Sequence, residues 1–424
     1  MIKANNPDRK SWIPVSKDSD FPVQNIPFGI FKTHTTGPTV GSRIGNTVIN
    51  LAEVASQGYF DDLKLPDKTV FQKSRLNEFI GLGKSVTNAV RDRIAEIFDE
   101  KNTDAKNDKK LISQALHDAD DVEMRMPVEV GDYTDFYSSE EHARNVGTMF
   151  RDPDNALLPN WKHLPVGYHG RSSSIVVSGT NIHRPKGQTK PADSDKPVFG
   201  PCKLFDFELE MAFVTGKKTS LGESVTTGEA EDHIFGLVLF NDLSARDIQK
   251  WEYQPLGPFL AKSFGSVISP WIVTLEAFEP FRTDGPHQKP EVMDYLKFQG
   301  KKSYDITLDV FLQPENSQEH RVCRSNFKYL YWNMAQQLAH QTVNGCNINI
   351  GDMYASGTIS GPERESFGSM LEISWKGTNP LKLPNGEERK FIQDNDSIIM
   401  RGFAQNDKIR IGFGESRTKI LPAK

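Results

Sequence analysis

The chain has few cysteines and no marked surplus of either charge. Its 424 residues include only Cys202, Cys323 and Cys346, which are too few and too scattered for a disulfide framework or a cysteine-rich zinc site. Its 51 Lys and Arg residues nearly balance 56 Asp and Glu residues, for a formal net charge of −5. General binding to nucleic acid needs a broad basic surplus, so we expect no nucleic-acid partner. The low cysteine content favours a reducing, intracellular compartment.

Long apolar runs and several well-known catalytic motifs are also missing. No run approaches the ~18 apolar residues of a membrane-spanning helix, so we expect no membrane partner. The polar start, MIKANNPDRK, lacks the apolar core of a secretory signal. No G-x-G-x-x-G follows a strand, and neither H-E-x-x-H nor G-x-S-x-G is present. These absences favour a cytosolic protein that acts on a small molecule.

The pattern of the chain predicts a small first domain (1–123) and a larger second domain (124–424). In the first, β-type runs at 28–33 and 46–54 are separated by Gly, Pro and Ser, which is typical of a compact barrel or meander. A helix is expected near 74–98 and a solvated bend or linker over the polar segment 99–110.

The second domain is predicted to be rich in β-structure. Runs of β-branched and aromatic residues, such as 204–213, 234–240 and 305–312, alternate with Gly and Pro. One clear helix is expected from Ser325, as its N-cap, to about Val343. The predicted fold class is therefore mainly β or α+β, with a few helices.

Two carboxylates in the run Phe207-Glu208-Leu209-Glu210-Met211 are the strongest local signal. Residues two apart in a strand share a face, so Glu208 and Glu210 are predicted to stand side by side. Their repulsion would be relieved by a hard divalent cation, which prefers carboxylate oxygens. From these residues alone, an exposed strand with a polar outer face is equally compatible with the pattern.

A third carboxylate, Asp242, follows the apolar run 234–240 directly and opens into a helix for which Ser244 is a candidate N-cap. Arg246, Gln249 and Tyr253 recur at helical spacing and form a donor face suited to an oxygen-rich anion. The alternative is a polar helix face that simply meets water. Lys262 lies in a Gly- and Phe-rich stretch, either to stabilise a developing oxyanion or as a surface lysine.

Two further segments contain candidate catalytic groups. In 132–151, Ser138 and Glu141 fit a capping box, which places His142 in the first turn of a helix as a candidate base or as a plain surface residue. In 351–375, Thr358 lies among small residues, and Glu372 is expected in an apolar strand, either paired with a His or facing outward.

Several of these segments together closely resemble the fumarylacetoacetate hydrolase family. The resemblance is carried by DYTDFYSSEEHARNVG, LFDFELEMAF, NDLSARDIQKWEYQPLGPFLAKSFG and ASGTISG, and it extends over essentially the whole chain. It implies a small SH3-like N-terminal barrel followed by a β-rich roll with a mixed sheet. It also implies a homodimer.

The resemblance also implies the roles of individual residues. A divalent ion, Ca²⁺ in the animal-type enzyme, would be held by Asp135, Glu208, Glu210 and Asp242, and a Mg²⁺ position would be bordered by Asp242, Lys262 and Ser266. Position 266 is Ser here, where the family usually has Thr. His142 would be the base and Glu372 its orienting partner. Arg246, Gln249 and Lys262 would surround the oxyanion, and the substrate contacts would be Tyr137, Arg151, Tyr168, Gln249, Tyr253 and Thr358.

The reaction implied is hydrolysis of a carbon–carbon bond in a β-diketo acid. 4-Fumarylacetoacetate would give fumarate and acetoacetate, the last step of tyrosine and phenylalanine catabolism. Two alternatives remain at this point: a related acylpyruvate hydrolase or decarboxylase of the same superfamily, and a calcium-binding scaffold without catalytic activity.

Overall fold

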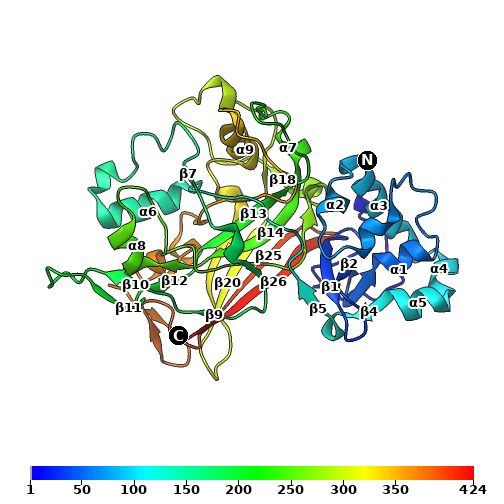
Figure 1. Cartoon of the computed structure of the whole chain (residues 1–424), viewed down its shortest axis with the longest axis horizontal. Coiled ribbons are helices and arrows are strands. Elements are labelled where there is room, and N and C mark those ends of the chain that lie inside the picture. Colours follow the sequence, from blue (N-terminus) through cyan, green and yellow to red (C-terminus); the bar gives the residue numbers. More distant parts are fainter. Residues whose placement is uncertain (1) are drawn as a thin grey trace.

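The computed structural model describes residues 2–424 (Figure 1). The N-terminal domain, blue to cyan in the figure, lies at one end of the long axis. The hairpin of β10 (Lys186–Thr189) and β11 (Val198–Pro201) projects at the other end. Strands dominate and helices are few and mostly short, so the predicted α+β class is confirmed.

The N-terminal domain is a five-stranded antiparallel sheet with helices packed against it. Its strands lie in the order β4-β3-β2-β1-β5. Their bounds are β1 Phe28–Lys32, β2 Thr39–Ile44, β3 Thr47–Asn50, β4 Leu116–Asp118 and β5 Glu123–Arg125. The helices are α1 Leu51–Ser56, α2 Asn77–Ile80, α3 Lys84–Ile97, α4 Thr103–Asn107 and α5 Lys109–Ala115. The division of the chain after residue 123 stays a prediction; β5 is the last strand of this sheet.

Two expectations for this domain were wrong. The single helix near 74–98 is two helices, because Gly83 takes a φ of 85° between them, a conformation that favours glycine. The polar segment 99–110 is not a linker but contains α4 and the start of α5. Its side chains act as caps: Asn102 accepts from the backbone N–H of Ala105, and Asp108 accepts from that of Leu111.

The second domain is built on a large mixed sheet. Its strand order is β7-β6-β22-β13-β14-β16-β8, with β17 also paired to β14. The bounds are β6 Tyr133–Phe136, β7 Gly167–His169, β8 Ile175–Val177, β13 Leu209–Thr215, β14 Ile234–Asp242, β16 Ser266–Ile268, β17 Val273–Thr274 and β22 Met353–Ala355. The β6–β22 and β16–β8 pairs are parallel, and the others are antiparallel.

A second sheet packs against the first, with the order β21-β20-β25-β26-β9. Its strands are β9 Ile182–His183, β20 Thr307–Gln313, β21 His320–Asn326, β25 Ser397–Gln405 and β26 Arg410–Leu421. Short strands β12 (Phe205–Asp206) and β15 (Ser244–Ala245) pair with each other; the pairs β18 (Arg282–Thr283) with β19 (Ser303–Tyr304) and β23 (Leu381–Lys382) with β24 (Glu388–Arg389) do likewise. The helices are α6 Glu140–Phe150, α7 Ala230–His233, α8 Arg246–Glu252, α9 Met334–Thr342 and α10 Met370–Ile373.

Both faces of the large sheet are buried, and side-chain alternation assigns each residue to one face. Along β14, Leu237 and Leu239 join the core shared with the second sheet, whereas Val238 and Phe240 join the core shared with the N-terminal domain. The whole of β13 is buried, so the exposed strand considered for Glu210 is wrong. Instead, the single carboxylate of this strand, Glu210, lies inside the molecule.

The helix expected over 325–343 begins later than predicted. Ser325 belongs to β21, and α9 starts at Met334 with Asn333 as its N-cap in a capping box with Gln336. Leu330 has the four-residue spacing of Met334 and Leu338, but it lies in a loop before the helix, where it bridges to Ser139 and packs into the core. Over residues 2–424, no helix is both long and apolar enough to cross a membrane.

Candidate active site

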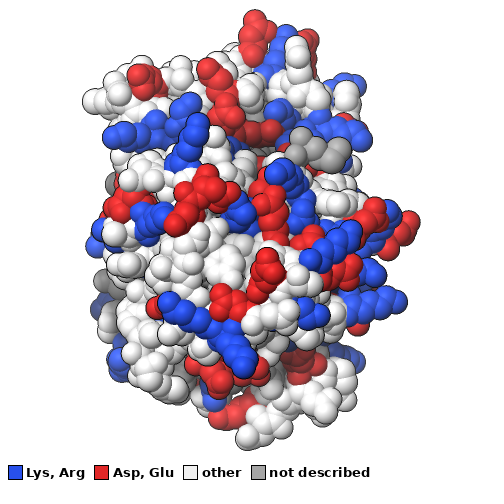
Figure 2. Space-filling view, turned by 90° about the vertical axis from the view of Figure 1, so that its right-hand side faces the viewer, with Lys and Arg blue, Asp and Glu red and all other residues white. Residues whose placement is uncertain are grey.

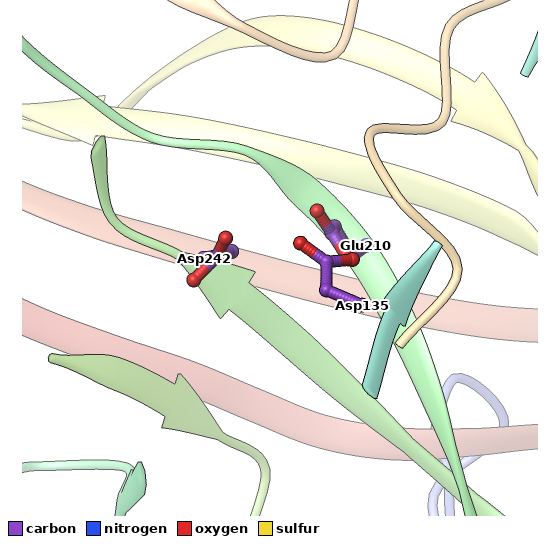
Figure 3. Close-up of side chains that lie close together, drawn as sticks. All are labelled: Asp135, Glu210 and Asp242. Atoms are coloured by element: carbon purple, nitrogen blue, oxygen red, sulfur yellow. The ribbon is translucent and has the colours of Figure 1, made fainter. Parts of the chain in front are cut away.

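Three carboxylates meet near the ends of three strands of the large sheet, two of them adjacent and the third separated by β22. Asp135 comes from β6, Glu210 from β13 and Asp242 from the last position of β14. One oxygen from each lies within 4.8 Å of the others, and Figure 3 shows the three side chains turned toward one another. By side-chain alternation, all three carboxylates lie on the face of the sheet that packs against the N-terminal domain. Each one comes directly after, or before, the apolar side chains of its strand on that face. The same row that forms a core therefore ends in a charged cluster.

These carboxylates are poorly satisfied by the protein itself. Oδ1 of Asp135 and Oε1 of Glu210 are buried without a hydrogen-bond partner among residues 2–424. Burial, reinforced by the neighbouring carboxylates, raises the pKa of Asp135 and Glu210 well above their ordinary values, and burial raises that of Asp242 despite Lys262. Unpartnered buried oxygens that repel one another fit a hard divalent cation, which prefers carboxylate ligands. The residues present can thus hold a metal ion.

A second layer of charge lies beside the cluster. The ammonium of Lys262 contacts Glu208 and lies 2.5 Å from Oδ2 of Asp242. Nη2 of Arg246 is 2.8 Å from Oε1 of Glu208. Although burial works to raise the pKa of Glu208, these two cations outweigh it and hold the pKa well below its ordinary value. Glu208 therefore faces protein cations here, and its assignment as a metal ligand stays a prediction.

Two further predicted residues contact Asp242. The hydroxyl of Ser266 donates to Oδ1 of Asp242 at 2.8 Å. The hydroxyl of Tyr168 lies 3.4 Å from Oδ2 of Asp242. Lys262 is only 8% exposed, so the surface lysine considered from the sequence is wrong.

The candidate base is fixed by a buried carboxylate. Nδ1 of His142 is 2.7 Å from Oε2 of Glu372, and both residues are almost completely buried. Glu372 also accepts from Asn145, Ser360 and Ser369. Burial works to raise the pKa of Glu372, but His142 and these donors hold it below its ordinary value. Since an ionised carboxylate only accepts, Nδ1 carries the proton and Nε2 is left as the basic nitrogen.

The local structure around this pair differs from the prediction. Glu372 lies not in a strand but in the short helix α10, whose N-cap Ser369 accepts from the N–H of Glu372. The helix that carries His142 has Ser139, not Ser138, as its N-cap, with the hydroxyl accepting from the N–H of His142. The surface alternatives for His142 and Glu372 are wrong, because each is buried.

The predicted substrate contacts are only partly gathered at this point. The ring of Tyr137 meets that of His142 edge-on at 5.2 Å, and burial together with Glu372 and Glu208 raises the pKa of Tyr137. Gln249 accepts from Nη1 of Arg246 at 3.2 Å, and Thr358 is buried. Arg151 and Tyr253 are exposed; Arg151 donates to the backbone carbonyl of Ala156, and the hydroxyl of Tyr253 accepts from the amide of Gln254.

The prediction that Ser244 is the N-cap of α8 was wrong. Ser244 belongs to β15, and α8 begins after Ala245 without a side-chain cap. The sequence reasoning also missed Asp206, which is fully buried and accepts from Nε of Arg246 at 2.8 Å. A signal was present, since Asp206, Glu208 and Glu210 recur at every second position.

A base oriented by a carboxylate, beside a buried acidic cluster and two cations, defines a site suited to metal-assisted hydrolysis. Comparisons with known proteins agree. The family pattern described as fumarylacetoacetate (FAA) hydrolase C-terminal matches residues 132–420, and that of the fumarylacetoacetase N-terminal matches residues 24–127. The chain belongs to the fumarylacetoacetate hydrolase family.

Individual relatives are similar over almost their full length. The fumarylacetoacetase of Dictyostelium discoideum is 53% identical over 420 residues, which cover 98% of each chain. That of Homo sapiens is 51% identical over 415 residues, covering 97% of this chain and 99% of the human one. The solved structure of a fumarylacetoacetate hydrolase from Exiguobacterium antarcticum has a TM-score of 0.53 at 17% identity and covers 94% of this chain and 100% of its own. This last similarity concerns the fold alone.

Proposed function

We propose that this chain hydrolyses 4-fumarylacetoacetate to fumarate and acetoacetate, the last step of tyrosine and phenylalanine catabolism. Relatives at about half identity over nearly their whole length bear the name fumarylacetoacetase, and the chain is accordingly a hydrolase of carbon–carbon bonds that acts on a small molecule. The observation that carries the proposal is the buried pair His142–Glu372 beside the acidic cluster.

His142 is proposed as the base that activates water. With Nδ1 held by Glu372 at 2.7 Å, the lone pair of Nε2 is available to take a proton from water as it attacks a carbonyl. Glu372 keeps the tautomer and orientation of the ring and stabilises the imidazolium that forms. Burial of the pair excludes bulk water from this proton transfer.

Arg246, Gln249 and Lys262 are proposed to offset the negative charge that develops on the attacked carbonyl. Lys262 is buried, the side chain of Arg246 is only 9% exposed, and both are already oriented by Glu208, so their charges are in place before the reaction. Tyr137 and Arg151 are proposed to hold the distal carboxylate of the fumaryl group, and Tyr168, Tyr253 and Thr358 the rest of the substrate.

Asp135, Glu208, Glu210 and Asp242 are proposed to hold Ca²⁺, and Asp242, Lys262 and Ser266 to border a Mg²⁺ position. A divalent ion bound there would act as a Lewis acid toward the diketone oxygens and the departing enolate. The unpartnered oxygens of Asp135 and Glu210 support this assignment. The proton transfer and the stabilisation of charge on the attacked carbonyl are assigned to the side chains named above.

The test is to mix purified protein separately with 4-fumarylacetoacetate, with acylpyruvates and with oxaloacetate, each with and without chelator. The rate is followed by the loss of the absorbance of each substrate. We expect turnover of 4-fumarylacetoacetate that is far faster than that of the other substrates and is lost with chelator. Preference for an acylpyruvate or decarboxylation of oxaloacetate would indicate a related superfamily enzyme. No turnover, with calcium still bound, would indicate a scaffold.

We also propose a cytosolic homodimer. Apolar side chains are exposed beyond α8 and on the adjacent hairpin, including Leu256 (96%), Phe259 (68%) and Phe199 (73%). A clustered apolar surface of this kind marks an interaction site. By contrast, basic and acidic side chains are interspersed on the face of the N-terminal domain seen in Figure 2. Sedimentation velocity should show a dimer that Leu256→Asp dissociates, whereas Leu221→Asp, at another highly exposed site (82%), leaves it intact.

A further inference from the structure

Asp206 is a fully buried carboxylate that the proposed chemistry does not use. It ends β12 and pairs across to Ser244 of β15. Its oxygens accept from three donors on two separate elements. Oδ2 accepts from Nε of Arg246 at 2.8 Å and from the N–H of Leu371 at 3.1 Å, and Oδ1 accepts from the N–H of Met370 at 2.7 Å.

These two elements carry opposite halves of the candidate site. Arg246 begins α8 and supplies a cation for the carbonyl oxygen. Met370 and Leu371 begin α10, whose next residue, Glu372, holds His142 at 2.7 Å. With only four residues, α10 has little stability of its own, so its placement depends on such contacts. One carboxylate thus joins the cation to the element that orients the base.

We propose that Asp206 is a positioning residue that fixes the guanidinium of Arg246 relative to the His142–Glu372 pair. Charged hydrogen bonds to backbone and guanidinium groups in a buried site are short and directional. A displacement of about 1 Å between groups that act together can cost a factor of ~10² in rate. The inference rests on the proposed hydrolysis, since it assigns a role within that site.

The central test is Asp206→Asn, which keeps the shape and one oxygen but replaces the acceptor for Arg246 with an amide donor or an uncharged oxygen. We expect kcat to fall about 10- to 100-fold, with KM changed less than about threefold, because Asp206 does not touch the substrate. Calcium affinity, measured by titration calorimetry, should stay within about threefold of wild type. A rate within twofold of wild type would overturn the inference.

The chain offers a matched control in Asp396. Asp396 is equally buried (1%), accepts from Nε of Arg389 at 2.9 Å and also accepts from the backbone N–H of Gln393 at 2.9 Å. Asp396 contacts none of the site residues through these bonds. Asp396→Asn therefore measures how much stability and activity are lost merely by breaking a buried Asp–Arg pair. We expect a similar loss of melting temperature in both variants but a lower kcat only in Asp206→Asn. Equal losses of kcat would mean that Asp206 is merely structural.

A double-mutant cycle tests whether Asp206 acts through Arg246. In an Arg246→Lys background, Asp206→Asn should lower kcat less than about threefold, since the group to be positioned has already been replaced. Fully additive effects would overturn the inference. If Asp206→Asn does not fold, Asp206→Glu keeps the charge and moves the carboxylate by one methylene; a wild-type rate in that variant would equally overturn it. Absence of turnover by the wild-type protein would instead refute the proposed hydrolysis.

Discussion

Two sets of buried carboxylates lie in one site, and their surroundings are opposite. Both oxygens of Glu372 accept hydrogen bonds, from His142, Asn145, Ser360 and Ser369. In contrast, Asp135 and Glu210 each have a buried oxygen without a partner within the described chain. The pKa of Glu372 is held below its ordinary value, whereas those of Asp135 and Glu210 are raised well above theirs.

The difference shows that burial alone does not decide what a carboxylate does. Desolvation acts on all of these groups, but only Glu372 has His142 and enough other hydrogen-bond donors beside it to outweigh desolvation. The protein itself therefore supplies all the partners that the His142–Glu372 pair needs. The acidic cluster, by contrast, needs an ion as its partner. Substitutions that make a carboxylate neutral should have opposite effects at the two places.

The largest effect is expected from His142→Ala. Removal of a general base costs about 10²–10⁴-fold in rate, so kcat with 4-fumarylacetoacetate should fall by at least that factor. Calcium binding, measured by titration calorimetry on the same sample, should be unchanged, since His142 lies outside the acidic cluster. A variant that turns over within tenfold of wild type would contradict the proposed role.

Neutral isosteres should separate the two sets directly. Glu372→Gln replaces an acceptor of several hydrogen bonds and should destabilise the metal-free protein by about 1–3 kcal/mol, or several degrees in Tm. Glu210→Gln removes a repelled charge and should leave the Tm of the metal-free protein equal or higher. Differential scanning calorimetry in chelator measures both. The comparison fails if both variants lose the same stability.

Metal removal should lower the stability of the wild-type protein. An ion that binds only the folded state adds about 2.7 kcal/mol at 100 times its Kd. We expect the Tm to fall by several degrees in chelator and to return with calcium. The double variant Asp135→Asn, Glu210→Gln should show no such response, and a persisting response would place the ion elsewhere.

A smaller effect should appear with pH in the metal-free protein. Folding raises the pKa of Glu210, so above this raised pKa the charged carboxylate destabilises the folded state. As the pH falls toward the ordinary pKa of a Glu, the folded state takes up the proton before the unfolded state does, and stability is regained. The Tm advantage of Glu210→Gln over wild type should therefore be largest near pH 8 and shrink toward pH 5. An advantage that is constant with pH would contradict the raised pKa.

The smallest effect is expected at position 266. Ser266→Thr keeps the hydroxyl that donates to Asp242 at 2.8 Å, so ion affinity should change less than about threefold. Ser266→Ala removes the donor and should weaken binding more. Titration calorimetry of both variants with calcium and magnesium compares them, and equal losses would show that the hydroxyl contact has no role.

Much of the site follows from local pattern. Alternation along β13 places Leu209, Met211 and Phe213 in one core and turns Glu210 to the opposite face. The strand that ends in Asp242 was recognised from its apolar run. The fold brings most of the residues named by the family resemblance near one another, but it leaves Arg151 and Tyr253 exposed.

Other features depended on tertiary contacts. Glu372 lies in a helical turn rather than a strand because Asp206 accepts from the first N–H groups of that turn and Ser369 caps it, and such long-range hydrogen bonds leave no local signal. The apolar repeat before α9 resembled a helix because packing from a loop and from a helix face uses the same residue types.

The sequence by itself determined the α+β class, the family and the residue types available for chemistry, since composition and alternation are local properties. Only the tertiary structure decided how each carboxylate is partnered. Asp135 and Glu372 are 237 residues apart in the chain, and whether a buried oxygen meets donors, cations or another carboxylate depends on which segments the fold brings together. These partners set the pKa values of the carboxylates. They also distinguish the His142–Glu372 pair, which the protein satisfies itself, from the acidic cluster, which is suited to an ion.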